Sequence, residues 1–164
     1  MADEAREGIS HSLGKIPSGL FIVTFFNQEL NQPDGILMSW VQQVSFEPPA
    51  VSVATKKDRK GLELIKKAKY FVVNIMGKEN AKMIGSFYKG IGEAKFEGIN
   101  TIKAKNSNTL ILEDAVSYLE CELSNILETE GDHVIMFGKI LSGQLLNSDQ
   151  NEPSVHLRKN GFDY

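Results

Sequence analysis

A cluster of hydroxyl and cationic side chains occupies the segment Thr55, Lys56, Lys57 and Arg59. The segment follows an apolar alternating stretch and precedes an amphipathic one, so it is expected where a strand ends and a helix begins. The free N–H groups of a helix N-terminus bind anions, and neighbouring cations strengthen that binding. The pattern therefore predicts a phosphate-sized anion site, although such a site is common and names no ligand by itself.

Basic residues continue beyond this cluster. Seven of the eighteen Lys and Arg residues fall close together, and these are Lys56, Lys57, Arg59, Lys60, Lys66, Lys67 and Lys69. For the last three, a solvated helix face is the competing interpretation. Residues 113–132 form an opposite, acidic block that contains no Lys or Arg.

A second candidate lies on a strand predicted over residues 36–46. Alternation places Met38 and Trp40 on one face of this strand and Ser39 and Val41 on the other. Together with the next predicted strand, this segment is a candidate surface for binding a flat ring. The alternative is a Trp in the core and a Ser that faces water.

Small side chains follow on the next predicted strand, where Ser52 and Ala54 alternate with valines. If the two strands are neighbours, these small residues let a planar ring approach the backbone. Unpaired main-chain N–H groups would then be able to bond the nitrogen and oxygen atoms of that ring.

A third candidate is the sequence Gly131-Asp132-His133. The competing interpretation is an ordinary hairpin turn. His133 nevertheless stands at an element boundary, where a histidine can titrate near neutrality. The single cysteine, Cys121, falls on the apolar face of a predicted strand, and a buried free thiol is ordinarily inert.

Several common chemistries are absent from the sequence. It contains no G-x-x-x-x-G-K-[ST] phosphate loop, no H-E-x-x-H and no G-x-S-x-G. The three histidines are too far apart for a local metal motif, and no metal site is predicted. The sequence offers few side chains that could catalyse a reaction by themselves, which indicates that a bound cofactor supplies the chemistry.

The predicted elements that position these residues are mostly strands. Strands are expected at residues 20–26, 36–46, 50–55, 70–76, 115–129 and 133–145, and helices at 58–68, with Asp58 as N-cap, and at 78–88. Loops are expected at 27–35, with a turn at Pro33-Asp34-Gly35, and at 90–107. Successive strands without an intervening helix favour an antiparallel sheet, most simply a small closed barrel.

The strand at 115–129 has the clearest alternation in the chain. Its predicted dry face carries Leu119, Cys121 and Leu123, and its predicted wet face carries Glu120, Glu122 and Ser124.

Length and charge bound the class of protein. The chain has 164 residues and a net charge of −3, which argues against bulk attraction to nucleic acid or an anionic membrane. No apolar run approaches the roughly 20 residues of a membrane span, and the first residues are acidic and polar, unlike a signal peptide. We expect a soluble cytoplasmic protein, with an arm or short helix at residues 1–12 and one domain at 13–164.

Seven segments carry a resemblance to a known family. They are SGLFIVT at 18–24, MSWVQQVSFEPP at 38–49, VSVATKKDR at 51–59, FVVNIM at 71–76, YLEC at 118–121, GDH at 131–133 and VHLRKNGFDY at 155–164. In this order they resemble the flavin-reductase-like, FMN-binding split β-barrel family. The greatest likeness is to the C-terminal reductase domain of diflavin flavodiiron proteins, and flavoredoxin is similar.

The resemblance implies a mainly β, Greek-key split barrel with short flanking helices, which dimerises and binds FMN, or alternatively FAD, near the dimer interface. The family's flavin-contacting and phosphate-binding positions correspond to Met38, Ser39, Trp40, Val41, Ala54, Thr55, Lys56 and Arg59. The family's GDH loop lies near the nicotinamide, which assigns that place to His133 as the catalytic candidate.

The resemblance implies an NAD(P)H:flavin reductase that takes electrons from NADH or NADPH and delivers them to free flavin, ferric iron or a protein acceptor. Flavodiiron relatives reduce oxygen or nitric oxide at a diiron centre, but this chain lacks a histidine and carboxylate set for iron. One alternative is an FMN-bearing electron-transfer protein reduced by a partner protein, without a nicotinamide step. Another is a β-barrel module that binds an anionic ligand through the basic cluster.

Overall fold

The computed structural model describes residues 2–88, 90–92, 95–147, 149 and 152–163. Tyr164, which ends the motif at 155–164, lies outside the described residues, as do Met1 and two positions, 93 and 94, of the loop predicted at 90–107. Within the described part of the chain, no helix is long and apolar enough to cross a bilayer.

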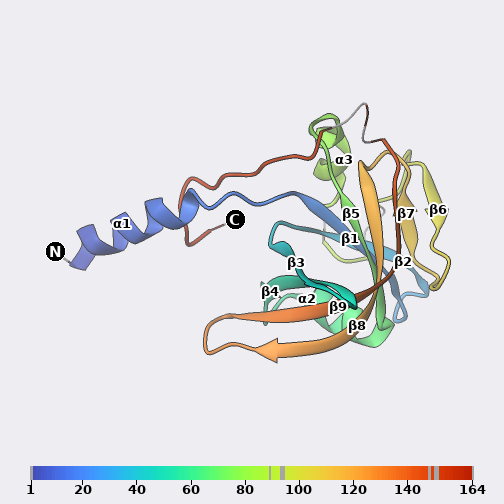
Figure 1. Ribbon diagram of the computed structural model, residues 1–164, viewed down its shortest axis with the longest axis horizontal. Helices are drawn as coiled ribbons and strands as arrows, with labels where there is room; N and C mark the ends of the chain where they lie inside the picture. The colour runs from blue at the N-terminus through green and yellow to red at the C-terminus, as the bar shows by residue number, and fades with distance from the viewer. Residues whose placement is uncertain (1, 89, 93–94, 148, 150–151, 164) are drawn as a thin grey trace.

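Seven antiparallel strands form the main sheet in the order β2-β1-β5-β8-β9-β4-β3 (Figure 1). Their bounds are Phe21–Asn27 for β1, Gln32–Met38 for β2, Val41–Phe46 for β3, Pro49–Lys56 for β4, Tyr70–Ile75 for β5, Ser117–Glu128 for β8 and His133–Leu145 for β9. A second, two-stranded sheet pairs β6 (Thr101–Lys103) with β7 (Leu110–Leu112). The helices are α1 (Ala2–Gly14), α2 (Lys60–Ala68), η1 (Lys78–Asn80) and α3 (Ala81–Ser86).

The connection between β2 and β3 closes this sheet into a barrel. The two strands lie at opposite ends of the strand order, yet Ser39 and Trp40 alone join them. From the Cα of Met38 to the Cα of Val41 the chain spans at most about 11 Å, so the sheet must curl until its edges approach. The carbonyl of Trp40 then accepts a hydrogen bond of 2.9 Å from the amide of Ala54. This geometry confirms the predicted mainly β, Greek-key split barrel.

The same connection corrects the strand predicted at 36–46. Because the chain leaves one edge at Met38 and joins the other at Val41, the alternation does not continue, and Met38 and Trp40 do not share one strand face. Pro33-Asp34-Gly35 lies inside β2 rather than in a turn, which falls at residues 28–31. Pro33 is tolerated because β2 is an end strand of the order and needs fewer ladder bonds.

The barrel interior is filled by alternate residues of the strands and plugged by α2. The largest buried cluster includes Val23, Phe25, Ile36, Val51, Val53, Phe71 and Met136. Leu62 and Ile65 of α2 are 2% and 0% exposed, as the predicted periodicity of that helix requires. The helix begins at Lys60, with Arg59 at the N-cap and no side-chain cap, so the prediction of Asp58 as N-cap was wrong.

A second layer covers part of the outer face of the sheet and overturns one prediction. Ala104 and Ile111, from the segment containing β6 and β7, pack on Val72 and Tyr118. Glu120 lies under the same segment and is 0% exposed, although the alternation of β8 predicted a wet face there. Strand alternation identifies the two faces of a sheet, but it does not reveal which segment covers each one.

The helix α1 projects away from the barrel, and the C-terminal residues run beside the segment that joins α1 to β1 (Figure 1). The amide of Arg158 donates to the carbonyl of Gly14 at 3.2 Å, and its guanidinium donates to the carbonyl of Leu13 at 3.1 Å. The C-terminal residues therefore return to the start of the chain and are fixed against it.

Candidate functional site

A cavity of about 620 Å³ opens where the ends of β2 and β4 meet the start of α2. Its charged side chains are Lys56, Asp58, Arg59 and Lys60, and His156 lies with them. Its apolar lining includes Leu20, Ile36, Leu37, Phe87 and Ile91. Ligand sites in proteins commonly occupy about 300–1,000 Å³ and combine apolar walls with a few polar groups. The cavity has the size and composition of a small-molecule site.

The cationic end of this cavity is built by the junction of β4 and α2. β4 ends at Lys56, and α2 begins at Lys60, and both lysines line this end. Gly61 also lines the cavity; a Cβ there would meet Ile36 at 2.6 Å, so its lack of a side chain lets the helix approach β2. The junction thus places Lys56 and Arg59, two of the four residues predicted for an anion site, beside a helix start.

Arg59 links this junction to the end of β2. Its guanidinium donates to the carbonyl of Leu37 at 2.9 Å and contacts the sulfur of Met38 at 3.9 Å. These bonds hold the side chain against the cavity wall and orient its charge.

Thr55 is placed differently from its neighbours. Ala54 and Lys56 line the cavity, but the side chain of Thr55 points into the barrel and is 0% exposed. Its hydroxyl has no hydrogen-bond partner among the described residues. The alternation of β4 explains the difference, because Thr55 shares the inward face with Val53.

The Ser39–Trp40 connection separates two cavities. Ser39 and Ala54 line both the first cavity and a second one of about 500 Å³, to which Trp40 and Val41 also belong. Ser39 is buried and Trp40 is partly exposed, which is the reverse of a core Trp beside a solvent-facing Ser. The candidate residues Met38 to Val41 therefore border a cavity at the barrel seam, by which we mean the Ser39–Trp40 connection where the two edges of the sheet meet.

His133 reaches the same region from the start of β9. It stands opposite Lys56 in the β4–β9 ladder, and its imidazole lies 4.9 Å from the ring of Trp40, with the planes inclined by 36°. Its Nδ1 is 2.7 Å from Oδ1 of Asp132. This hydrogen bond lowers the pKa of the Asp132 carboxyl, and the charge of Lys56 adds to the effect.

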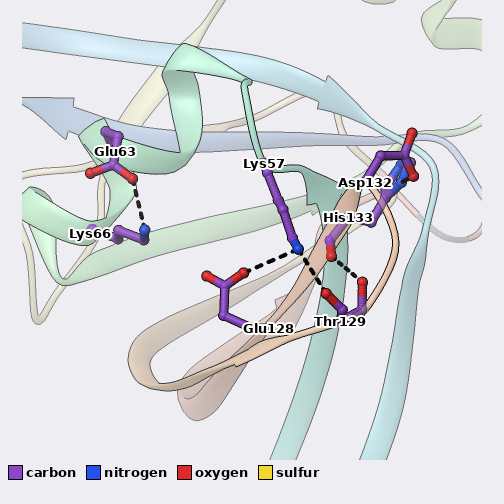
Figure 2. A network of polar contacts seen from close by, with 7 residues as sticks. All are labelled: Lys57, Glu63, Lys66, Glu128, Thr129, Asp132 and His133. Atoms are coloured by element: carbon purple, nitrogen blue, oxygen red, sulfur yellow. Dashed lines mark hydrogen bonds and ion pairs between the residues drawn. The ribbon is translucent and has the colours of Figure 1, made fainter.

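Lys57 does not face the cavity, although it was part of the basic cluster. Its Nζ donates to the carbonyl of Thr129 at 2.7 Å and lies 3.5 Å from the carboxylate of Glu128 (Figure 2). The hydroxyl of Thr129 in turn donates to the carbonyl of His133. Lys57 therefore fixes the β8–β9 hairpin that carries His133.

The remaining lysines of the basic run have two kinds of surroundings: some are paired on the protein surface, and others line the cavity. Lys66 pairs with Glu63 at 2.7 Å on an exposed face (Figure 2), and Lys67 pairs with Glu29. For these two, the solvated helix face is the correct interpretation. Lys56 and Lys60 line the cavity instead.

A buried ion pair supports the opposite wall of the cavity, and the sequence analysis missed it. Lys95 and Asp34 have side chains 0% and 1% exposed, with Nζ 2.7 Å from Oδ1. Asp34 also accepts from Asn27 at 3.2 Å and from the amide of Gly92 at 2.9 Å. Ile91, which lines the cavity, is therefore held beside β2. The two partners are far apart in sequence, so no local pattern signals them.

Cys121 is a structural residue, as predicted. It is 0% exposed, and burial, assisted by the charge of Glu120, raises the pKa of its thiol to about 12. A thiol that stays protonated at neutral pH is a poor nucleophile.

The fold and the cavity define a class of small antiparallel split β-barrels, with a ligand cavity where strand end, helix start and barrel seam meet. Residues 13–163 match the family described as the flavin reductase like domain, and the chain belongs to that family. The family predicted from the seven sequence segments is thereby confirmed.

Similar proteins agree with this assignment. The chain is 35% identical over 159 residues to diflavin flavoprotein A 1 of Synechocystis sp., covering 95% of this chain and 27% of that protein. The chain thus spans about a quarter of the length of the curated relatives it matches.

Two solved structures share the fold. The nitrilotriacetate monooxygenase component B homologue from Mycobacterium thermoresistibile has a TM-score of 0.84 at 21% identity, covering 97% of this chain and 86% of that chain. The flavin reductase HpaC, solved as a complex with NADP+, has a TM-score of 0.77 at 26% identity, covering 97% and 95%.

Proposed function

We propose that this chain is an NAD(P)H:flavin oxidoreductase that binds FMN, or alternatively FAD, in the cavity of about 620 Å³. The observation that carries the proposal is the pairing, in one cavity, of a cationic helix start with apolar walls beside the Ser39–Trp40 seam. Membership of the flavin reductase-like family supports it. The NADP+ complex of HpaC supports a nicotinamide as electron donor.

The residues present fit a flavin mononucleotide. Lys56, Lys60 and the first N–H groups of α2 supply the charge and donors that a phosphate requires. Ile36 and Leu37 supply apolar surface for a ring system. The small side chain of Ala54 lets such a ring approach the backbone of the seam.

The bound flavin would supply the redox chemistry, accepting electrons from NADH or NADPH and passing them to free flavin, ferric iron or a protein acceptor. The protein contributes binding and orientation. Lys56, Arg59 and Lys60 would hold the phosphate end, and main-chain donors near Trp40 would stabilise negative charge on the ring. His133, oriented by Asp132, positions the nicotinamide.

We further propose that the protein acts as a homodimer. Phe46, Leu145 and Val155 are 88%, 67% and 71% exposed, on an end strand, on the end of β9 and on the C-terminal segment. Large apolar side chains of this exposure mark surfaces that partners cover. Sedimentation velocity should give a mass of two chains, and a single-chain mass at micromolar concentration excludes the dimer.

The test of the enzymatic function is an anaerobic absorbance titration of FMN-loaded protein with NADH and then with NADPH. Loss of the oxidised flavin band within seconds supports the reductase and identifies the preferred donor. The same titration with excess FMN covers the case in which flavin is a substrate that exchanges freely.

Two other results would exclude the reductase. Tightly bound FMN that resists both donors indicates instead an electron-transfer protein reduced by a partner protein. Binding of inorganic phosphate without measurable binding of FMN or FAD indicates a module for other anionic ligands.

A further inference from the structure

Residues 152–158, which we call the C-terminal strap, cross the barrel between the two cavities. Main-chain hydrogen bonds fix the strap to Lys78, Met76, Ser18 and Gly14. The pair with Ser18 is reciprocal, with N–O distances of 3.0 and 2.7 Å at His156. The strap is therefore a bonded part of the domain, and its side chains have defined directions.

Alternation along the strap turns two side chains toward the candidate site. His156 lines the first cavity together with Lys56 and Arg59. Val155 and Leu157, on the opposite side, are 71% and 55% exposed. Successive residues of an extended chain point in opposite directions, so Arg158 shares the side of His156.

Arg158 reaches Trp40. The carbon of its guanidinium lies over the indole at 5.0 Å from the ring centroid, within the range of a cation–π contact. The guanidinium is also anchored by hydrogen bonds of 3.1 Å to the carbonyls of Leu13 and Gly161. Because Trp40 is partly exposed and also packs against His133, this anchored cation holds the indole from a third segment of the chain.

We propose that the C-terminal strap is a wall of the flavin site, in which His156 contacts the bound flavin and Arg158 is a positioning residue for Trp40. The contact of His156 rests on the proposed flavin function, whereas the effect of Arg158 on Trp40 is a property of the flavin-free protein. His156 contributes a hydrogen-bonding group to a cavity whose charged side chains lie at the junction of β4 and α2.

The experiment uses the emission of Trp40, the only tryptophan of the chain, and titration of the full-length protein with FMN. Arg158→Met should change the emission maximum of flavin-free protein and raise its quenching by acrylamide at least about two-fold, and Arg158→Lys should restore most of the wild-type behaviour. His156→Ala should weaken FMN binding about 10-fold, the loss expected for one hydrogen bond to a charged or polar group. His156→Gln should retain part of the FMN affinity that His156→Ala loses.

Two control variants test whether the changes come from Arg158 and His156 themselves or from a general loosening of α1 and the C-terminal residues. Lys159→Met removes a positive charge from the exposed neighbouring position. Arg6→Met removes a cation that lies 4.5 Å from the ring of Phe162 in the arm, away from Trp40. Neither control should alter Trp40 emission or FMN affinity. The strap is bonded through its main chain, so the His156 variants should fold, and their thermal unfolding checks this.

The outcomes distinguish failure of the proposal about the C-terminal strap from failure of the proposed flavin function. Wild-type protein that binds no flavin overturns the proposed function and the His156 contact with it. Wild-type binding that is unchanged in His156→Ala overturns the strap as a wall of the site. Equal emission and quenching in Arg158→Met, Lys159→Met and wild type overturn the positioning of Trp40. Should Arg158→Met fail to fold, Arg158→Gln, which removes the cation but keeps a hydrogen-bond donor, is compared with Arg6→Met, and equal emission and quenching in these two variants overturn it as well.

Discussion

The imidazole of His133 lies against the indole of Trp40, with ring centroids 4.9 Å apart and planes inclined by 36°. Strand β4 makes this contact possible because it borders both residues. The amide of Ala54 bonds the carbonyl of Trp40, and Lys56, two positions on, stands opposite His133 in the ladder. A residue of the barrel seam and a residue of a distant hairpin are thus aligned on one strand.

Replacement of His133 tests its place in catalysis. His133→Ala should slow reduction by NADH or NADPH by about 10- to 100-fold, because a misplaced reactant loses that much. FMN affinity should stay within about two-fold, since the phosphate is held by other groups. Stopped-flow absorbance gives the rate, and fluorescence titration gives the affinity. Loss of FMN binding in this variant would instead make His133 a flavin ligand or a structural residue.

The cationic end of the cavity can be tested by comparing two flavins. Lys56→Met should weaken binding of FMN by roughly 10-fold or more, the value of a charge-assisted bond, and should leave binding of riboflavin unchanged. Riboflavin lacks the phosphate, so it serves as the internal control. Lys66→Met removes a similar charge from an exposed ion pair with Glu63 and should affect neither ligand. An equal loss for both flavins would place Lys56 at the ring instead.

The buried pair of Asp34 and Lys95 should contribute to stability. Lys95→Met leaves the Asp34 carboxylate buried without its cation and should lower the free energy of unfolding by about 3–5 kcal/mol. Urea denaturation measures this loss. The double variant Asp34→Asn with Lys95→Met should cost less than the sum of the single variants, because the two groups interact directly. Strict additivity would show that the pair is energetically uncoupled.

Glu120 should make stability depend on acid pH. Burial alone would raise its pKa, but hydrogen bonds from Asn106, Ser107 and Ser142 outweigh burial and lower the pKa below the ordinary value of 4.5. A lowered native pKa means stability that is present above the unfolded pKa and lost as the pH falls through the native one.

Glu120→Gln provides the matching measurement. This variant should be less stable than wild type at pH 7, by about 1–3 kcal/mol, because an uncharged amide loses charge-assisted bonds. The difference should narrow as the pH falls from about 4.5, where the carboxylate becomes protonated in the unfolded chain, through the lower pKa of the native carboxylate. Thermal unfolding at pH 7, 5 and 3.5 follows it, and a difference that stays constant over this range would contradict the assignment.

Local patterns predict much of the fold and part of the site. The alternation of β4 and the periodicity of α2 place Lys56 and Arg59 at a strand–helix junction, and both line the cavity. The break after Met38 could not be predicted, because Ser39 and Trp40 continue a strand-like pattern while the chain passes from one sheet edge to the other.

The features of the site that could not be predicted depend on contacts between residues far apart in the sequence. Asp34 was predicted in a turn because Pro, Asp and Gly are adjacent, whereas its partner Lys95 lies much further along the chain. His156 lies in the segment VHLRKNGFDY that carries part of the family resemblance, but that segment alone assigns it to no cavity, and the reciprocal bonds with Ser18 place it there. Which segments meet is decided by tertiary packing, and alternation along one strand carries no information about it.

The two-residue seam also has a consequence for the order of folding. The β1–β2, β3–β4 and β8–β9 hairpins are local and can form early, whereas the β1–β5, β5–β8 and β4–β9 ladders join distant segments and are slow to close. Ser39 and Trp40 reach their native positions only when both groups of ladders are in place. The cavity is therefore completed in the last stage of assembly, so a ligand that fits it binds the finished barrel alone and stabilises that state by mass action.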